Sequence, residues 1–272
     1  MIRGRFTLPD GRLLAWREVG SGPAVVLLHG WTMTGGVFSE LANLLATDFR
    51  VLLPDLPGHG TSSPSANVSM RQMATDLAAW LHTVAPTPCL LGGWSLGGMV
   101  ALSLVAEVGL MPQGLALIST TPRFTQDKDW SFGLPVTEVR LLERNLKRSF
   151  QPTLGQFFKR MFADELVSAE RLREIRQFAV YGENLPDATN AARLLRQFAN
   201  QDQRALLAHV HCPVLVVHGE RDEITPVAAG RYLAEMCKRT RLQVLPAVGH
   251  APFLSQPEIV AAELESFVEW CR

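Results

Sequence analysis

The chain has 272 residues, of which 47% are hydrophobic and 19% are charged, and its 26 basic residues balance its 26 acidic ones. This composition excludes a chain that is disordered throughout and predicts a globular protein with a sizeable core. The balanced charge lacks the basic excess of a nucleic-acid-binding surface, so we expect no nucleic-acid partner.

The sequence favours neither a membrane anchor nor a disulfide framework. No apolar stretch typical of a signal peptide follows the first basic residues. Residues 89–106 are uncharged and approach the length of a membrane span, but their glycines and serines favour a buried strand, a tight turn and a buried helix. The four cysteines show no C-x-x-C spacing. We therefore expect free thiols, no zinc site and a cytoplasmic location.

Strands and helices alternate in the predicted elements of the first 121 residues. In chain order they are two strands around an Asp-Gly turn (6–18), a strand (24–28), a helix (38–45), a strand (49–53), a helix (70–84), a strand (88–91), a helix (99–108) and a strand (114–119). Short apolar runs separated by amphipathic helices are typical of a mostly parallel sheet whose strands are buried on both faces.

The pattern changes near residue 122. Residues 124–209 contain no convincing buried strand and read as mostly helical, and strands and helices then alternate again to the end of the chain. The sequence predicts an α/β fold with a core domain of residues 1–121 and 210–272 and a helical cap of residues 122–209. Such caps close active sites and select substrates.

The stretch Gly93-Trp94-Ser95-Leu96-Gly97 fits the pattern G-x-S-x-G between a predicted strand and a predicted helix. In this context the serine lies on a strained turn with its Oγ exposed. Backbone N–H groups at the start of the helix then face a developing oxyanion. The pattern predicts Ser95 as a nucleophile, and a glycine-rich structural turn is the alternative.

A serine hydroxyl needs a general base, and the chain order expected for this arrangement is serine, acid, histidine. His250 follows the last predicted strand, and Asp222 follows the first strand after the helical insertion. We expect His250 to accept the proton of Ser95 and Asp222 to hold the imidazole. Glu220 and Glu223 compete for the role of the acid, and a buried structural histidine is the alternative for His250.

Two backbone N–H groups are candidates for the oxyanion hole, those of Trp31 and Leu96. Trp31 lies in the loop after the strand at 24–28, and its ring is expected to form a wall of the pocket. His29 in the same loop is expected to brace it by hydrogen bonds rather than to act as a base. Asp55 is expected to stabilise a turn.

Five motifs in this order resemble the α/β-hydrolase fold superfamily: HGW (29–31), PDLPGHG (54–60), GWSLGG (93–98), GERD (219–222) and GHAPF (249–253). The resemblance covers the whole expected sheet domain. Haloalkane dehalogenases and epoxide hydrolases of this superfamily use an aspartate nucleophile, and Ser95 argues against both.

A closer resemblance is to the pimeloyl-acyl-carrier-protein methyl ester esterases of biotin synthesis. It rests on LHGW (28–31), GGWSLGG (92–98) and GHAPFLS (249–255), with PRF (122–124), DW (129–130) and SF (149–150) in the cap. The resemblance implies hydrolysis of the methyl ester of a pimeloyl chain held on acyl carrier protein, with release of methanol.

The same resemblance implies that the acidic carrier docks on basic residues of the cap. The candidates are Arg140, Arg144, Arg148, Lys159 and Arg160. An ordinary solvated helix face is the alternative reading of these charges. Pro152 and Gln156 stand near positions that are basic in the family, a departure that bears on how the carrier docks.

An ester with a methylene chain requires apolar walls near the serine. Trp31, Leu96, Phe124, Phe157 and Phe253 are the candidates, and the core of the cap is the alternative for Phe124 and Phe157.

The sequence therefore predicts a serine carboxylesterase that works through an acyl-enzyme and needs neither a metal nor a cofactor. The competing hypotheses are another hydrolase with the same three residues (a short-chain esterase, a lactonase or a carbon–carbon bond hydrolase) and a non-enzymatic small-molecule receptor on the same fold.

Overall fold

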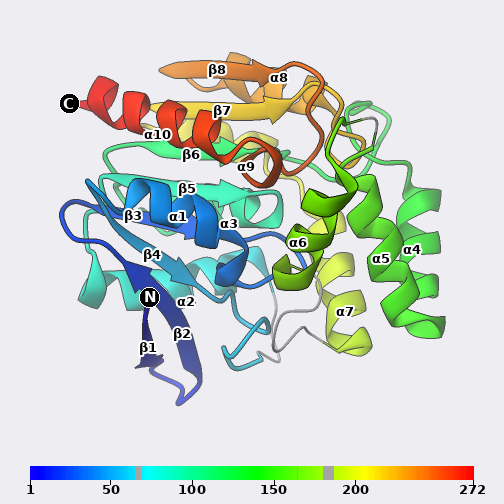
Figure 1. Ribbon diagram of the computed structural model, residues 1–272, viewed down its shortest axis with the longest axis horizontal. Helices are drawn as coiled ribbons and strands as arrows, with labels where there is room; N and C mark the ends of the chain where they lie inside the picture. The colour runs from blue at the N-terminus through cyan, green and yellow to red at the C-terminus, as the bar shows by residue number, and fades with distance from the viewer. Residues whose placement is uncertain (65–68, 164, 180–186) are drawn as a thin grey trace.

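The computed structural model describes residues 1–64, 69–163, 165–179 and 187–272. Within these ranges the strands form one eight-stranded sheet in the order β1-β2-β4-β3-β5-β6-β7-β8 (Figure 1). The strands are β1 (Ile2–Thr7), β2 (Leu13–Val19), β3 (Ala24–Leu28), β4 (Arg50–Pro54), β5 (Leu90–Trp94), β6 (Leu115–Ile118), β7 (Val214–Gly219) and β8 (Thr240–Leu245). β2 pairs antiparallel with β1 and β4, and all other neighbours are parallel. The predicted mostly parallel α/β sheet is confirmed.

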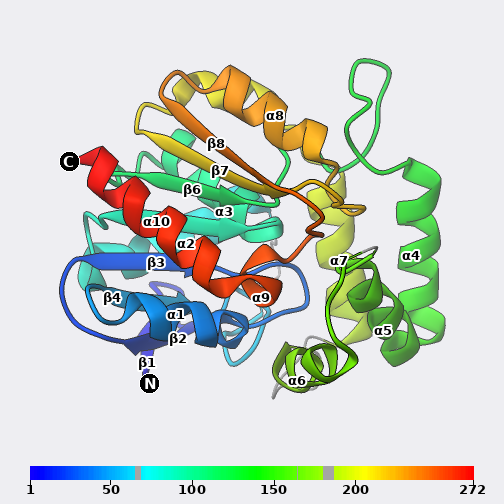
Figure 2. The ribbon, with the colours of Figure 1, turned by 45° about the horizontal axis from the view of Figure 1, so that its top comes forward.

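The central strands form because helices bury their apolar runs from both sides. All residues of β6 are fully buried. One face of the sheet is covered by α1 (Ser39–Leu45) and α10 (Pro257–Cys271), and the other by α2 (Met70–Val84), α3 (Leu96–Ala106) and α8 (Val227–Met236) (Figures 1 and 2). The hydrophobic core therefore lies in two layers, one on each side of the sheet.

The junction between β5 and α3 is tighter than predicted. The sequence predicted several residues of loop there, whereas β5 continues through Trp94 and α3 begins at Leu96. Gly92 and Gly93 stay in the sheet, paired with β6, because the ladder needs only their backbone groups. Ser95 alone therefore connects the strand to the helix.

Between β6 and β7 the chain forms a group of helices beyond the carboxyl ends of the parallel strands (Figures 1 and 2). They are α4 (Val136–Arg148), α5 (Phe150–Arg160), α6 (Ala169–Ala179) and α7 (Ala188–Ala199). We call this group the cap. Because α/β sheets place their sites at the carboxyl ends of strands, the cap lies on the side where a site is expected.

The two ends of the cap are fastened to each other at its base. The N–H of Gln203 donates to the carbonyl oxygen of Pro122 (2.8 Å), and Arg123 contacts Asp202 (2.7 Å). The short helix η2 (Arg204–His209) then packs against α3 on the way to β7. The cap boundaries at residues 122 and 209 stay a prediction. The end of that range, η2, lies against the sheet domain.

In the described parts of the chain, no helix combines the length and the apolar character that crossing a membrane requires.

Candidate active site

Ser95 occupies a strained turn between β5 and α3. Its backbone angles are φ 54° and ψ −118°, a left-handed conformation that costs a non-glycine residue about 1–3 kcal/mol. The turn is held from both sides, because the Ser95 N–H donates to the carbonyl of Ile118 (3.0 Å) and its own carbonyl accepts from the hydroxyl of Thr120 (2.6 Å). The side chain of Ser95 stays half-buried rather than sealed in the core.

Glycines around Ser95 allow the strand and the helix to approach each other. A Cβ added at Gly97 would lie 2.0 Å from the carbonyl oxygen of Leu28, and one at Gly93 would lie 2.3 Å from that of Gly97. Both distances are far inside van der Waals contact, so a side chain at either position would force α3 away from the sheet. The glycines thus fix where the start of α3 lies relative to Ser95.

Asp222 and His250 form a buried hydrogen-bonded pair after β7 and β8. His250 Nδ1 donates to Asp222 Oδ2 at 2.8 Å, and both side chains are almost fully buried. The N–H groups of Ile224 and Thr225 donate to Asp222 Oδ1, each at 2.8 Å, and the Thr225 hydroxyl donates to Oδ2 at 2.8 Å. These bonds hold the carboxylate in one orientation, with Oδ2 facing the imidazole.

The surroundings of Asp222 keep it ionised. Burial opposes the charge of this carboxyl, but the attraction of His250 and the hydrogen bonds from His218 and His250 outweigh burial and hold its pKa well below the ordinary value. The carboxylate therefore fixes the proton of His250 on Nδ1 and stabilises the imidazolium that forms when the other ring nitrogen accepts a proton.

The two competing carboxylates lie elsewhere. Glu220 Oε2 accepts from the N–H of Ala247 (3.3 Å), and Glu223 lies half-exposed beside Arg160, with 3.6 Å between Oε2 and Nε. Asp222 is therefore the carboxylate of this loop that the fold places on His250.

The indole of Trp94, the residue before Ser95, supports His250 from the sheet side. Its Nε1 donates to the carbonyl oxygen of His250 at 2.8 Å, and the two rings lie 5.4 Å apart. Phe253 also packs against this indole, at 5.1 Å, and against Phe38 at 4.6 Å, with no exposed surface. The structure thus gives Phe253 a core position behind His250.

The two predicted oxyanion donors lie at the start of α3, for Leu96, and in the loop after β3, for Trp31. Leu96 is the first residue of α3, so its N–H has no acceptor within the helix. The N–H of Trp31 donates to no acceptor in the described residues. Unpaired N–H groups at a helix start and in the neighbouring loop are the groups that an oxyanion hole requires.

Two buried polar residues of these loops have structural partners. His29 Nδ1 donates to the carbonyl of Gly30 (2.8 Å) and Nε2 accepts from the N–H of Leu56 (2.9 Å), and burial lowers the pKa of His29 to about 4. Asp55 pairs with Arg17 at 3.2 Å. His29 is therefore a neutral brace between two loops.

Trp31 connects the loop after β3 to the cap. Its Nε1 donates to the carbonyl of Ala191 in α7 (3.0 Å), and its ring meets Phe157 of α5 edge-on at 5.2 Å and Phe198 at 6.1 Å. Phe124 is buried against Phe198 at 4.9 Å. The rings of Trp31 and Phe157 lie at the junction of cap and sheet domain, whereas Phe124 packs within the cap.

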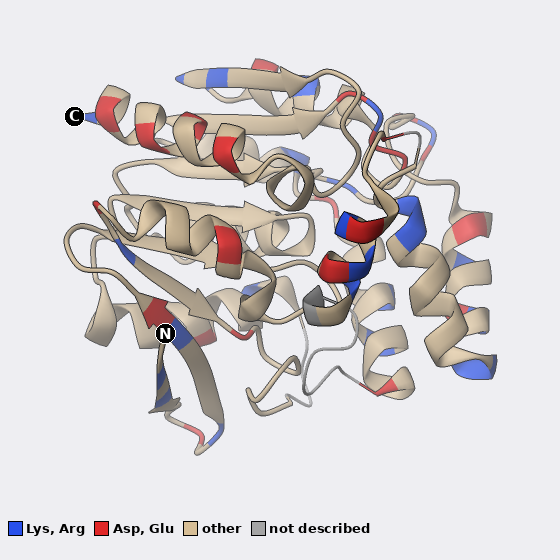
Figure 3. Ribbon diagram, viewed as in Figure 1, with Lys and Arg blue, Asp and Glu red and all other residues tan. Residues whose placement is uncertain are grey.

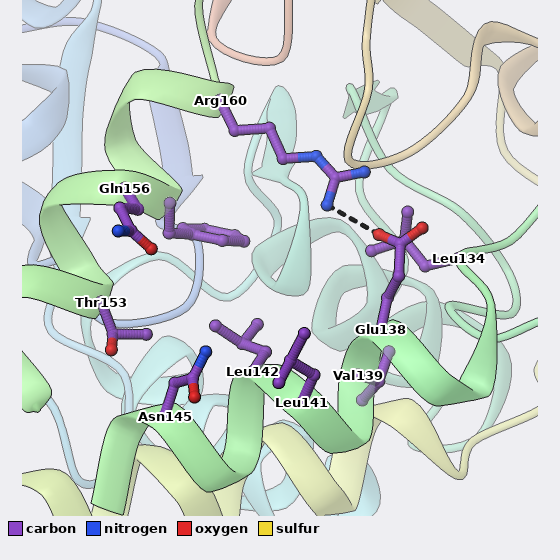
Figure 4. Close-up of a pocket in the computed structure, with 10 residues that line it drawn as sticks. Leu134, Glu138, Val139, Leu141, Leu142, Asn145, Thr153, Gln156 and Arg160 are labelled. Carbon is purple, nitrogen blue, oxygen red and sulfur yellow. Dashed lines mark hydrogen bonds and ion pairs between the residues drawn. The ribbon is translucent and has the colours of Figure 1, made fainter. Parts of the chain in front are cut away.

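A cavity of about 210 Å³ lies between α4 and α5 (Figure 4). Its apolar lining comes from Leu134, Val139, Leu141, Leu142 and Phe157. Arg160 lies at one end, where it pairs with Glu138 at 2.9 Å. Since Phe157 also touches Trp31, this cavity and the loop after β3 share one aromatic wall.

Basic residues lie along α4 and at the end of α5 (Figure 3). Arg140, Arg144, Arg148 and Lys159 are exposed, and within the described ranges none of them forms an ion pair. Arg160 differs from these four, because it is half-buried and its guanidinium is bound to Glu138 and to the carbonyl of Glu223 (3.0 Å).

Several contacts of the site carry no signal in the sequence. The hydroxyl of Thr225 donates to Asp222 Oδ2, the indole N–H of Trp94 to the carbonyl of His250 and the hydroxyl of Thr120 to the carbonyl of Ser95. The bonds of Trp94 and Thr120 join residues far apart in the chain, so no motif reveals them. Thr225 follows Asp222 closely in the chain, but it belongs to none of the motifs. No cluster of side chains suited to a metal ion occurs in the part of the chain that the structure describes.

Comparison with known proteins places the chain in a family. The model of the family described as "Alpha/beta hydrolase family" matches residues 25–263. Pimeloyl-acyl-carrier-protein methyl ester esterase of Chromobacterium violaceum is 35% identical over 251 residues, which cover 92% of this chain and 96% of that protein. The protein of the same name from Nitrosomonas europaea is 37% identical, with 88% and 93% covered.

Among solved structures, an esterase from Exiguobacterium antarcticum has a similar fold, with a TM-score of 0.90, 26% identity and coverage of 97% of this chain and 98% of that one. The strand order of the sheet, the strained turn at Ser95 and the similarity to these relatives all indicate the same family. The chain belongs to the alpha/beta hydrolase family, as an ester hydrolase related over nearly its whole length to the pimeloyl-acyl-carrier-protein methyl ester esterases.

Proposed function

We propose that this protein hydrolyses the methyl ester of a pimeloyl chain carried on acyl carrier protein, through an acyl-enzyme on Ser95. The observation that carries the chemistry is the bond from Trp94 to the carbonyl of His250, which links the strained turn at Ser95 to the loop of the buried Asp222–His250 pair. The substrate is inferred from relatives that are 35% and 37% identical and carry that name.

The reaction proceeds in two steps. His250 takes the proton of Ser95 Oγ as this oxygen attacks the ester carbonyl, and the N–H groups of Trp31 and Leu96 bind the oxyanion. The intermediate expels the methoxy group, which leaves as methanol with the proton from His250. Water activated by His250 then attacks the acyl-enzyme and releases the free acid, while Asp222 stabilises each imidazolium.

The cavity between α4 and α5 suits the acyl chain. A pimeloyl methyl ester carries its scissile bond at one end and its carrier at the other, so the chain has to cross the cap to reach Ser95. The apolar side chains of Val139, Leu142 and Phe157 line this cavity, and Phe157 contacts Trp31 beside the oxyanion donors. We therefore assign residues 122–209 the role of a substrate-selecting cap.

The exposed basic residues of the cap suit an acidic carrier. Arg140, Arg144, Arg148 and Lys159, which form no ion pair with any described residue, project positive charge near the cavity, and such charge accelerates the encounter with an acidic partner. Arg160 contributes less to docking, because its guanidinium is already held by Glu138 and Glu223. The free thiols of the four cysteines support a protein that functions in the reducing cytoplasm.

The test measures methanol release from methyl pimeloyl-carrier, from free methyl pimelate and from p-nitrophenyl butyrate. We expect the wild type to cleave the carrier-bound ester with the highest kcat/KM and the Ser95→Ala variant to cleave none of them. Cleavage of the small esters alone would reject the carrier-bound substrate and leave a general esterase. Full activity of Ser95→Ala would reject the nucleophile.

The docking surface is tested separately by charge reversal. Arg144→Glu should raise KM for the carrier-bound ester and leave hydrolysis of p-nitrophenyl butyrate unchanged. Arg5→Glu, at an exposed position of the edge strand β1 and far from α4 (Figure 1), is the matched control and should change neither. Equal effects of both variants would reject the cap as the docking surface.

A further inference from the structure

The turn that follows α5 is bonded directly to the loop of His250. The N–H of His250 donates to the carbonyl oxygen of Met161 at 2.7 Å, and the N–H of Gly249 donates to Glu165 Oε2 at 3.0 Å. Two successive N–H groups of the His250 loop therefore find their acceptors in the cap rather than in the sheet domain.

Gly249 makes this contact sterically feasible. A Cβ at this position would lie 2.3 Å from the carbonyl oxygen of Met161 and 3.3 Å from Glu165 Oε2. Only glycine allows the loop and the cap turn to approach so closely. The glycine of the GHAPF motif thus serves the contact with the cap as well as the path of the loop.

The rest of α5 reaches the other parts of the site. Phe157 lies against Trp31, and Arg160 donates to the carbonyl of Glu223, the residue after Asp222. One helix and its following turn therefore touch the loops of the proposed oxyanion donor, the acid and the base. Among these contacts of α5 and its turn, the bond to Met161 is the only one, within the described residues, that reaches the backbone of His250 itself.

The orientation of the His250 imidazole depends on the backbone that carries it. Trp94 holds the carbonyl of His250 and Asp222 holds its Nδ1, but its N–H and that of Gly249 are held by the cap. Without an acceptor, these buried N–H groups would favour a different loop conformation, because an unpaired buried donor is costly.

We propose that Glu165 is a positioning residue, which together with the Met161 carbonyl holds the Gly249–His250 backbone so that the imidazole faces Ser95. The proposal rests on the role of His250 as the base. The proposal assigns the cap a part in the chemical step that is separate from substrate selection. The hydrolysis of esters too small to fill the cavity should therefore also depend on Glu165.

Glu165 acts here as a hydrogen-bond acceptor, and its carboxyl forms no ion pair within the described residues. It is half-buried, and burial raises the pKa of its carboxyl. A glutamine offers the same acceptor oxygen without a charge, so Glu165→Gln should preserve the contact, whereas Glu165→Ala removes it.

The experiment compares kcat and KM for p-nitrophenyl acetate among wild type, Glu165→Ala, Glu165→Gln and Glu170→Ala. Glu170 is an exposed carboxylate of α6 and serves as the matched control. We expect Glu165→Ala to lower kcat about 10- to 100-fold, the range that a small misplacement of a catalytic group produces, with KM nearly unchanged. Glu165→Gln should restore most of kcat, and Glu170→Ala should match wild type.

Gly249→Ala provides a second variant that keeps the carboxylate but separates the loop from the turn. It should reproduce the loss of kcat seen in Glu165→Ala. The concentration of competent sites is determined in every case from the final stoichiometry of labelling by a fluorophosphonate, so that a fraction of unfolded protein does not count as lower kcat.

An unchanged kcat in Glu165→Ala, or an equal loss in Glu165→Gln, would overturn the proposal. A change confined to KM would overturn it as well, since it would place Glu165 in substrate binding. If the carrier-bound ester proves not to be a substrate while p-nitrophenyl acetate still shows this pattern, the proposed substrate fails and the positioning role stands.

Discussion

The indole N–H of Trp94 donates a 2.8 Å hydrogen bond to the carbonyl oxygen of His250. Trp94 ends β5 and His250 follows β8, and β6 and β7 lie between these strands in the sheet. The bond therefore connects the residue next to the nucleophile with the proposed base across two intervening strands. The two loops behave as one unit rather than as independent strand ends.

Replacing this indole should affect stability and catalysis together. Trp94→Phe keeps an aromatic ring but leaves the buried carbonyl of His250 without its donor, which should lower the free energy of unfolding by about 1–3 kcal/mol. We also expect kcat for p-nitrophenyl butyrate to fall by about tenfold, since the imidazole loses one support. Urea denaturation and steady-state kinetics measure the two effects.

Trp80→Phe is the matched control for that substitution. Trp80 is also fully buried, but its Nε1 has no hydrogen-bond partner in the described residues. It should lose packing energy without losing kcat. Equal losses of kcat in the two variants would show that the indole N–H of Trp94 has no special role.

The identity of the acid can be tested by comparing three amide variants. Asp222→Asn retains the shape of the side chain but removes the charge that fixes the imidazole tautomer, so kcat should fall by about 10⁴-fold. Glu220→Gln and Glu223→Gln should retain nearly the wild-type kcat, because neither carboxylate touches His250. A large loss in either glutamine variant, with Asp222→Asn active, would reassign the acid.

Two glycine substitutions should change stability in opposite directions. Gly97→Ala places a Cβ against the carbonyl of Leu28, so it should lower the free energy of unfolding by about 2–3 kcal/mol through overpacking. Gly155 lies inside α5, where the end of the Arg176 side chain, at 3.5 Å, is the only described group that an added Cβ approaches. Gly155→Ala should therefore stabilise the protein by about 0.5–1 kcal/mol, as alanine does in a helix. Urea denaturation of both variants checks the two signs.

The pKa of Glu165 predicts how stability depends on pH. Burial raises it above the ordinary value of 4.5, so the folded protein holds this proton more tightly than the unfolded chain. The contribution of Glu165 to stability should then be greatest below the ordinary pKa and fall as pH rises through the window between the ordinary and the raised pKa.

The Glu165→Gln variant has no such titration and isolates this effect. The free energy of unfolding of wild type minus that of the variant should decrease as the pH rises from about 4 to about 8 in urea titrations. A difference that is constant or increases with pH would contradict a raised pKa.

The order of elements could be predicted from the sequence because each central strand is a short apolar run, and the ends of these runs locate Ser95, Asp222 and His250. The motif could not show that β5 continues through Gly92 and Gly93, because glycine carries no strand signal of its own. Neither could a residue pattern show the bond between Trp94 and His250 or the one between Glu165 and Gly249, which join segments far apart in the chain.

The sequence also could not show which aromatic residues line the cavity and which lie in the core. An apolar residue beside a proposed histidine reads in sequence as a wall of the pocket, and Phe253 was a candidate on that ground. In the structure it packs between Phe38 and Trp94 without exposed surface, whereas Phe157 lies at the cavity and against Trp31. Hydrophobicity alone does not distinguish a core position from a cavity wall.

The fastened base of the cap, where Pro122 meets Gln203 and Arg123 meets Asp202, bears on how such an enzyme can diversify. The chain leaves and re-enters between β6 and β7, which are neighbours in the sheet, so the enclosed segment can be exchanged or lengthened without altering the strand order. Such an exchange is limited at one place, because a new segment must still supply acceptors to the N–H groups of Gly249 and His250. Grafts that replace the rest of the cap but keep Met161 and Glu165 should therefore give new specificity more readily than grafts that remove these two residues.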